Sequence, residues 1–99
     1  MCRKAHGAAF ATYGGVAADQ VKIIAGEESI TKYQSSPDVQ RWFCSTCGAN
    51  LRWSSRRHAD LFEIPYGILD GEPNLKPTMH IYSASKAPWF EITDGLVQK

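Results

Sequence analysis

The sequence predicts a nearly all-β domain built from short antiparallel strands. Short runs rich in β-branched and aromatic residues recur between Gly, Pro, Asp and Ser breakers. No segment longer than about ten residues keeps the 3.6-residue hydrophobic period of an amphipathic helix. The chain has 99 residues, 43% of them hydrophobic and 21% charged, which is ordinary for one globular domain. We therefore expect a single domain over residues 1–99.

The expected elements follow in chain order. Residues 2–6 have room for one helical turn before Gly7 ends it. The strands that we expect after this turn are residues 10–13, 21–24, 30–33, 40–43, 50–53, 61–66, 80–83 and 89–92. Residues 40–43 and 50–53 flank a short turn, and their alternation places Leu51 and Trp53 on one face. These two strands are predicted to form a β-hairpin.

Charge and cysteine usage limit the classes of partner. Eleven Lys and Arg against ten Asp and Glu give a net charge of +1. This charge is too small to indicate binding to nucleic acid or to an acidic membrane. No apolar run approaches the ~20 residues that cross a bilayer, and the N-terminus lacks the order of a secretion signal. Three cysteines, two of them close together, suit a metal or redox site in a reducing compartment. We expect a cytoplasmic protein with no nucleic-acid or membrane partner.

The segment Cys44-Ser45-Thr46-Cys47-Gly48 carries the clearest chemical signal. Its two-residue spacer lets both sulfurs turn toward one point about 2.3 Å from each, and Gly48 can adopt a positive φ after the turn. A thioredoxin-type redox pair is the main alternative, but that motif begins a helix after a parallel strand, whereas strands are predicted on both sides here. The motif therefore predicts a zinc knuckle with Cys44 and Cys47 as ligands.

A closed structural zinc site needs four ligands, so two more must come from elsewhere. The possible nitrogens are His6, His58 and His80, and Cys2 with His6 could chelate from a single helical turn. No histidine has a partner at a sequence spacing typical of zinc ligands, such as H-x₃₋₅-H. Each is therefore more simply interpreted as a surface or strand residue. Taken alone, Cys2 is interpreted as an ordinary small buried residue.

Three groups of residues, in their order along the chain, resemble the glutathione-dependent formaldehyde-activating enzyme family, which includes centromere protein V. They are residues 1–10, then residues 35–37 followed by 41–48, and finally His80-Ile81 with residues 85–89. The resemblance covers nearly the whole chain. It implies an all-β, tent-like fold in which small antiparallel sheets are stacked and held by zinc.

The resemblance also implies two cysteine clusters. In the family, an early C-x-C joins the CxxC in a structural zinc site, and a C-x-C-x-x-C holds a second, catalytic zinc. Cys44 and Cys47 match the CxxC, and Cys2 matches the last cysteine of the catalytic cluster. The metal ligands expected here are therefore Cys2, Cys44 and Cys47. Because the sequence begins one residue before Cys2, we expect a shortened member that lacks the N-terminal cysteine-bearing hairpin, with an incomplete zinc site.

The activity that the resemblance implies is that of a zinc-dependent carbon-sulfur lyase. Such an enzyme adds the thiol of glutathione to formaldehyde, in the manner of an S-(hydroxymethyl)glutathione synthase, so the expected cofactor is zinc and the expected partner a small thiol. Arg3, Lys4 and His6 would lie near the catalytic metal and could meet a glutathione carboxylate, although a solvated basic turn explains them equally well.

Other interpretations stay open. One is a non-catalytic β-domain that forms a homodimer through the surface left by the missing hairpin. Another is intermolecular metal binding, in which Cys44 and Cys47 of one copy meet cysteines or His6 of another. An empty pair of thiols, or a disulfide, is a third outcome for the CxxC. The large aromatic residues are expected to be core rather than a ligand cleft, namely Trp42, Phe43, Trp53 and Trp89.

Overall fold

The computed structural model describes residues 2–99, which form two compact units. Residues 13–72 form one of them, which we call the sheet unit. The segment that ends at Thr12 combines with residues 73–99 in the other, the terminal unit. The expected mostly β structure is confirmed, because strands outweigh one short α-helix in the described residues. The expectation of a single domain over the whole chain stays a prediction.

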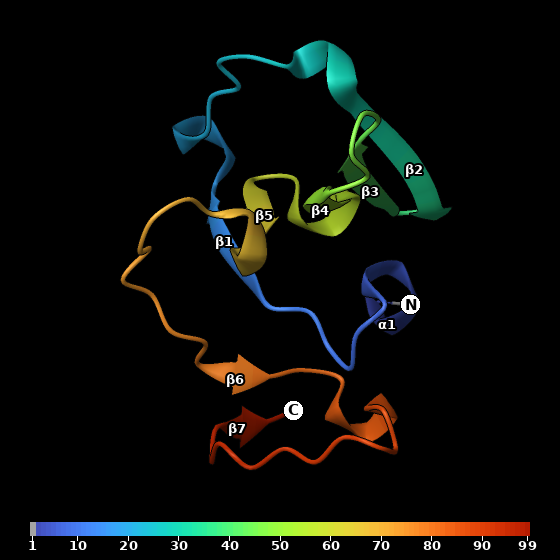
Figure 1. Cartoon of the computed structure of the whole chain (residues 1–99), viewed down its shortest axis with the longest axis vertical. Coiled ribbons are helices and arrows are strands. Elements are labelled where there is room, and N and C mark those ends of the chain that lie inside the picture. The colour runs from blue at the N-terminus through green and yellow to red at the C-terminus, as the bar shows by residue number, and fades with distance from the viewer. Residues whose placement is uncertain (1) are drawn as a thin grey trace. The chain divides into compact units, whose positions relative to one another are not determined.

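The sheet unit contains one five-stranded antiparallel sheet (Figure 1). Its strands lie in the order β1-β5-β4-β3-β2, so β2 to β5 follow one another as a meander and β1 pairs with β5. The strands are β1 (Tyr13–Ala17), β2 (Ile30–Ser36), β3 (Val39–Cys44), β4 (Asn50–Ser55) and β5 (Leu61–Pro65). The predicted strands at 30–33, 40–43 and 50–53 are thus confirmed, and the one at 61–66 is confirmed as far as Pro65.

One row of side chains across the sheet joins three strands. Lys32 lies opposite Trp42 in the β2–β3 ladder, and Trp42 lies opposite Arg52 in the β3–β4 ladder. The Lys32 ammonium and the Arg52 guanidinium lie 4.2 and 4.6 Å from the centre of the Trp42 ring, and Arg52 also lies 4.0 Å from the Phe62 ring. The Trp42 indole N–H donates to Ser54 Oγ at 3.1 Å. Cation–π contacts and this hydrogen bond therefore fix Trp42 against its neighbours.

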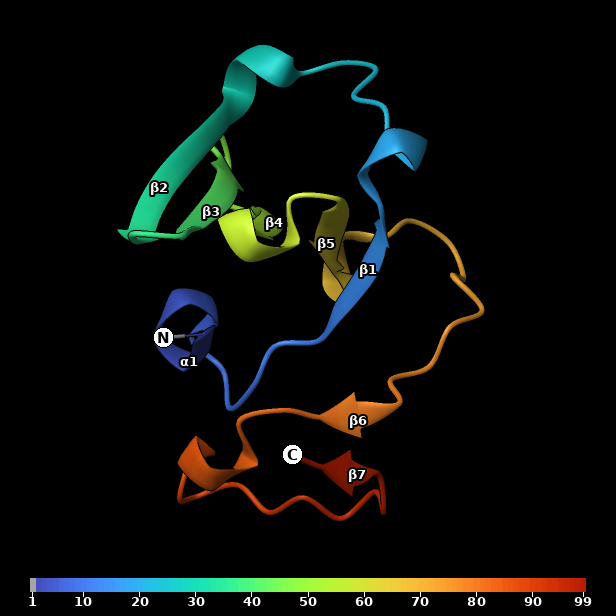
Figure 2. The same ribbon diagram turned by 180° about the vertical axis from the view of Figure 1, so that it is seen from behind.

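The terminal unit consists of short segments from both ends of the chain (Figure 2). Its helix α1 (Cys2–His6) confirms the single helical turn predicted there. Strands β6 (Met79–His80) and β7 (Val97–Gln98) pair in parallel, which differs from the antiparallel pairing expected of all strands. The Phe10 ring lies 5.1 Å from the Phe90 ring and 6.5 Å from the His80 ring.

Within residues 2–99, five single turns of 3-10 helix lie in the connections. They are η1 (Ala18–Gln20), η2 (Glu27–Ser29), η3 (Arg56–His58), η4 (Tyr66–Ile68) and η5 (Ser83–Ser85). None of the helices among residues 2–99 is both long and apolar enough to cross a membrane.

The expected strand at 10–13 is displaced, because the strand begins at Tyr13 and continues through two glycines. Gly14 and Gly15 lie opposite Ile64 and Glu63 of β5, and a Cβ at Gly14 would come within 2.6 Å of the Tyr66 ring. Gly14 therefore lets β1 approach the Tyr66 ring closely, because a side chain at this position would clash with the ring.

Three other expectations are wrong in whole or in part. Residues 21–24 form no strand, and Ile24 is 88% exposed, because a β-branched run needs a neighbouring strand to pair with. Of residues 80–83, His80 alone belongs to a strand. Residues 89–92 form none, and Trp89 is 69% exposed rather than core.

Candidate metal centre

The CxxC segment forms the turn between β3 and β4. Cys44 is the last residue of β3, and its backbone N–H donates to the Ala49 carbonyl at 2.9 Å. The Gly48 N–H donates to the Cys44 carbonyl at 2.8 Å, and Gly48 has a φ of 79°. This left-handed conformation is open to glycine without a steric penalty. The predicted hairpin context and the predicted positive φ of Gly48 are both confirmed.

The turn is also fixed from the side by the residue before β2. The Ser45 N–H donates to the Ser29 carbonyl at 2.7 Å, and the Ser29 and Thr46 hydroxyls lie 3.4 Å apart. Ile30, the next residue, lies opposite Cys44 in the β2–β3 ladder. Contacts from η2 and from the start of β2 therefore support the turn.

Backbone N–H groups point at the Cys44 sulfur. Hydrogen bonds from the backbone of Cys47, then of Thr46, and a contact with the Cys47 thiol lower the pKa of Cys44 below its usual value, while burial opposes this. The thiolate is the form of cysteine that binds metals, so the turn favours the ionisation state of a ligand. Cys44 is half-buried and Cys47 is exposed.

The donor set of this turn fits two of the ligands of a zinc ion. It contains two cysteines in one short turn, and backbone hydrogen bonds within that turn lower the pKa of Cys44, which favours the thiolate that a metal binds. No group of three or more Cys, His, Asp or Glu side chains that could hold a metal occurs within residues 2–99. Cys2 lies on α1 in the terminal unit, and its side chain is exposed. The assignment of Cys2, Cys44 and Cys47 as metal ligands stays a prediction.

The three histidines lie in different surroundings. His6 is half-buried at the end of α1, and His58 is exposed at the end of η3. The His80 Nε2 atom lies 2.8 Å from Asp94 Oδ2, and the His80 side chain is only 19% exposed. His80 is therefore a partner of a carboxylate in the terminal unit, a pairing that sequence spacing did not indicate.

A second set of residues that the sequence did not indicate is the Lys32, Trp42 and Arg52 row. Burial lowers the pKa of Arg52, although Glu63 opposes this, and burial likewise raises the pKa of Glu63. The three residues lie opposite one another on neighbouring strands. The row follows from the pairing register of these strands, which the sequence pattern alone did not supply.

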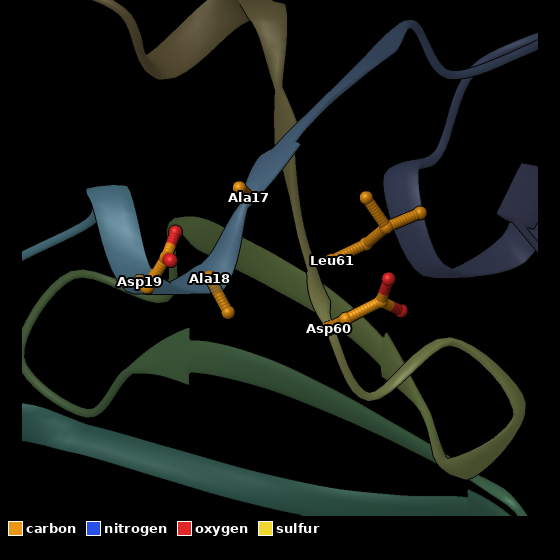
Figure 3. Close-up of a pocket in the computed structure, with 5 residues that line it drawn as sticks. All are labelled: Ala17, Ala18, Asp19, Asp60 and Leu61. Carbon is orange, nitrogen blue, oxygen red and sulfur yellow. The ribbon is translucent and has the colours of Figure 1, made fainter.

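A hollow of about 440 Å³ lies at the junction of β1, η1 and β5 (Figure 3). It is lined by Ala17, Ala18, Asp19, Asp60 and Leu61. The Ala18 N–H donates to the Asp60 carbonyl at 2.8 Å, so two of the lining residues are joined by a backbone hydrogen bond. Its lining offers two exposed carboxylates and no thiol or imidazole. The CxxC turn is therefore the stronger candidate for metal chemistry.

Comparison with known proteins gives one positive finding. The sequence model of a family described as "Glutathione-dependent formaldehyde-activating enzyme" matches residues 1–85. The matched range includes α1, the whole sheet unit and the CxxC turn. No curated protein and no solved structure matches the chain.

Proposed function

The chain belongs to the glutathione-dependent formaldehyde-activating enzyme family, and from this premise we propose that it is a zinc-dependent carbon-sulfur lyase. The reaction joins glutathione and formaldehyde to give S-(hydroxymethyl)glutathione. The family match over residues 1–85 is the observation that carries this proposal. The hydrogen-bonded CxxC turn supports its zinc dependence, because it already favours a thiolate.

The proposed chemistry is the addition of a thiol to a carbonyl group. The thiol proton leaves, the sulfur forms a bond to the formaldehyde carbon, and the carbonyl oxygen takes up a proton, so all atoms are retained in the product. Zinc, when bound, supplies positive charge that favours the thiolate form of a coordinated sulfur at neutral pH. The reverse reaction breaks the same carbon-sulfur bond.

The proposal divides the roles among the residues of this chain. Cys44 and Cys47 contribute two thiolates to a structural metal centre, and the N–H groups of Thr46 and Cys47 orient Cys44. In this proposal the stacked, tent-like arrangement of the family depends on that centre. Cys2 contributes a thiolate at the start of α1, where Arg3 and Lys4 on the same helix offer positive charge to a glutathione carboxylate.

The decisive experiment must separate catalysis from the spontaneous reaction of thiols with formaldehyde. Magnetisation exchange between ¹³C-formaldehyde and its glutathione adduct, followed by NMR, gives the exchange rate with and without protein. We expect zinc-loaded protein to raise this rate, and we expect a chelator or Cys2→Ser to return it to the spontaneous value. His58→Gln is the matched control, since His58 is exposed and lies outside the proposed site.

An exchange rate that zinc-loaded, folded protein leaves at its spontaneous value would contradict the enzymatic proposal. The non-catalytic β-domain that forms a homodimer stays a prediction, as does the cytoplasmic location. Sedimentation of the protein at increasing concentration tests the homodimer, because a monomer at all concentrations removes it.

A further inference from the structure

A carboxyl group and an indole ring occupy opposite positions on two central strands of the sheet. Trp53 of β4 pairs with Glu63 of β5, and both residues are half-buried. Directly opposite residues of an antiparallel pair project from the same face, with Cβ atoms about 5 Å apart. We propose that Trp53 and Glu63 form a binding site for the primary ammonium group of a small molecule.

The Glu63 carboxyl group has no direct partner in the part of the chain that the structure describes. Neither of the two ion pairs among residues 2–99 includes Glu63. No side chain or backbone N–H of these residues donates a hydrogen bond to it. A half-buried charge without such a partner is unfavourable, so a bound cation would compensate it.

Open space lies beside this carboxyl group because its other neighbour is a glycine. Gly15 of β1 lies opposite Glu63, and a Cβ there would meet no atom within 4 Å except one of the Glu63 side chain, at 3.9 Å. Ala17 and Leu61 form the pair two residues further along the same two strands, so they share this face. Both line the hollow of about 440 Å³ (Figure 3). A ligand of a few atoms therefore has room next to Glu63.

The chemistry of the pair favours a cation over an anion or a neutral molecule. A carboxylate accepts charge-assisted hydrogen bonds from an ammonium group, and the face of an indole ring attracts the same positive charge. An anion would be repelled by Glu63, and an uncharged alcohol would gain neither attraction. The two side chains together therefore recognise an ammonium group.

The charged groups near Glu63 do not fully compensate its burial. Burial raises the pKa of Glu63 above its usual value, although the positive charges of His58 and then of Arg52 oppose this. The Arg52 guanidinium is already engaged, because it donates to the Leu61 carbonyl at 3.0 Å and lies against two aromatic rings. These attractions leave room for a further cation at the carboxyl group.

The inference stands on the Trp53–Glu63 pair and does not rest on the lyase proposal. Primary ammonium groups occur in simple amines and also in glutathione, whose γ-glutamyl residue carries one. The experiment therefore begins with a simple amine that has no thiol, so that its result is independent of catalysis.

The test titrates the full chain with propylammonium chloride and follows the indole N–H of Trp53 by NMR. This signal is identified by its absence from Trp53→Phe. We expect a saturable shift in the wild type, and a dissociation constant raised at least about tenfold in Glu63→Gln, because the charge-assisted hydrogen bond is lost. Glu72→Gln is the matched control, since Glu72 is exposed in the same unit. Sodium chloride and 1-propanol should give no saturable shift.

A second measurement keeps a structural role of Glu63 apart from binding. Without ligand, Glu63→Gln should be at least as stable to urea as Glu72→Gln, because it removes a half-buried charge that has no partner. A Glu63→Gln variant that is clearly less stable would show that the carboxylate already has a partner in the fold, and this would overturn the inference. So would a folded wild type without a saturable shift, or equal dissociation constants for wild type and Glu63→Gln.

Glutathione and its N-acetyl derivative then distinguish the two sources of the ammonium group. If glutathione shifts the Trp53 signal and N-acetylation abolishes the shift, the site takes the ammonium group of the thiol. If propylammonium alone produces the shift, the site takes simple amines. Both results support the ammonium site, whereas a shift that N-acetylation leaves unchanged, together with no response to propylammonium, would contradict it.

Discussion

In the sheet unit, strands of five to seven residues are joined by antiparallel ladders, whereas the two strands of the terminal unit have two residues each and pair in parallel. Each sheet strand is stabilised by repeated hydrogen bonds and cross-strand side-chain pairs. The terminal unit instead depends on single contacts between distant segments, such as the His80–Asp94 pair and the contacts of Phe10. The two units should therefore respond differently to equivalent substitutions.

Two tryptophans give the largest expected contrast. Trp42 contacts Lys32, Arg52 and Phe62 in the sheet, whereas Trp89 in the terminal unit is 69% exposed. We expect Trp42→Ala to lower the free energy of unfolding by about 3 kcal/mol, because it removes a large packed ring. Trp89→Ala should change it by no more than about 0.5 kcal/mol. Urea unfolding followed by far-UV circular dichroism measures both.

Equal losses of unfolding free energy in the two variants would contradict this contrast, since they would mean that Trp89 is as important to stability as Trp42. Because both substitutions delete the same side chain, differences in the unfolded state largely cancel.

Replacing Gly48 in the sheet unit is expected to lower stability less than replacing Trp42. With a φ of 79°, it needs a conformation that costs an L-residue about 1–2 kcal/mol, so Gly48→Ala should lower the free energy of unfolding by that amount. Gly67→Ala is the matched control, because Gly67 does not have a positive φ and a Cβ there meets no atom within 4 Å. A Gly48 variant as stable as the Gly67 variant would show that the turn can change its conformation freely.

The smallest expected effect is a local one, the titration of the Asp94 carboxyl group in the terminal unit. The Leu96 N–H, then the His80 side chain, hold the pKa of Asp94 below its ordinary value of 3.8. A carboxyl group with a lowered folded pKa stabilises the fold above its unfolded pKa, and this contribution is lost as the pH falls through the lower, folded pKa. We therefore expect the NMR shift of the Leu96 amide to titrate with a midpoint below 3.8.

Two variants sharpen that titration. Asp94→Asn should abolish the acidic titration of the Leu96 amide, and Asp70→Asn should leave it unchanged, since Asp70 is exposed and lies in the other unit. A midpoint at or above 3.8 would mean that the Leu96 N–H does not favour the carboxylate.

The same contrast between the units explains how far the fold could be predicted. Alternation identified β2 and β4, and the runs at 40–43 and 61–66, which flank turns, identified β3 and β5, because these patterns are local. The pairing of β6 with β7 was missed, since two residues carry no period. The run at 21–24 was interpreted as a strand on β propensity alone, which does not supply a partner.

The candidate site shows the same limit. The CxxC turn and its glycine could be predicted from the sequence. The two-residue spacing of Cys44 and Cys47 and the positive φ of Gly48 are both local features of the chain. The contribution of Ser29 could not be predicted, because it depends on the register that places the start of β2 beside the turn. The His80–Asp94 pair was equally out of reach, since it joins residues that no local pattern relates.

The central claim is that the CxxC turn provides two thiolate ligands, and cobalt(II) substitution tests it most directly. Cobalt bound by cysteine gives a sulfur-to-metal charge-transfer absorption whose intensity increases with the number of thiolate ligands. Under reducing conditions we expect this absorption in the wild type, a weaker one in Cys44→Ser and in Cys47→Ser, and no change in Ser45→Ala. Wild-type protein whose cobalt spectrum lacks the thiolate band, or keeps it undiminished when both cysteines are replaced, would contradict the account.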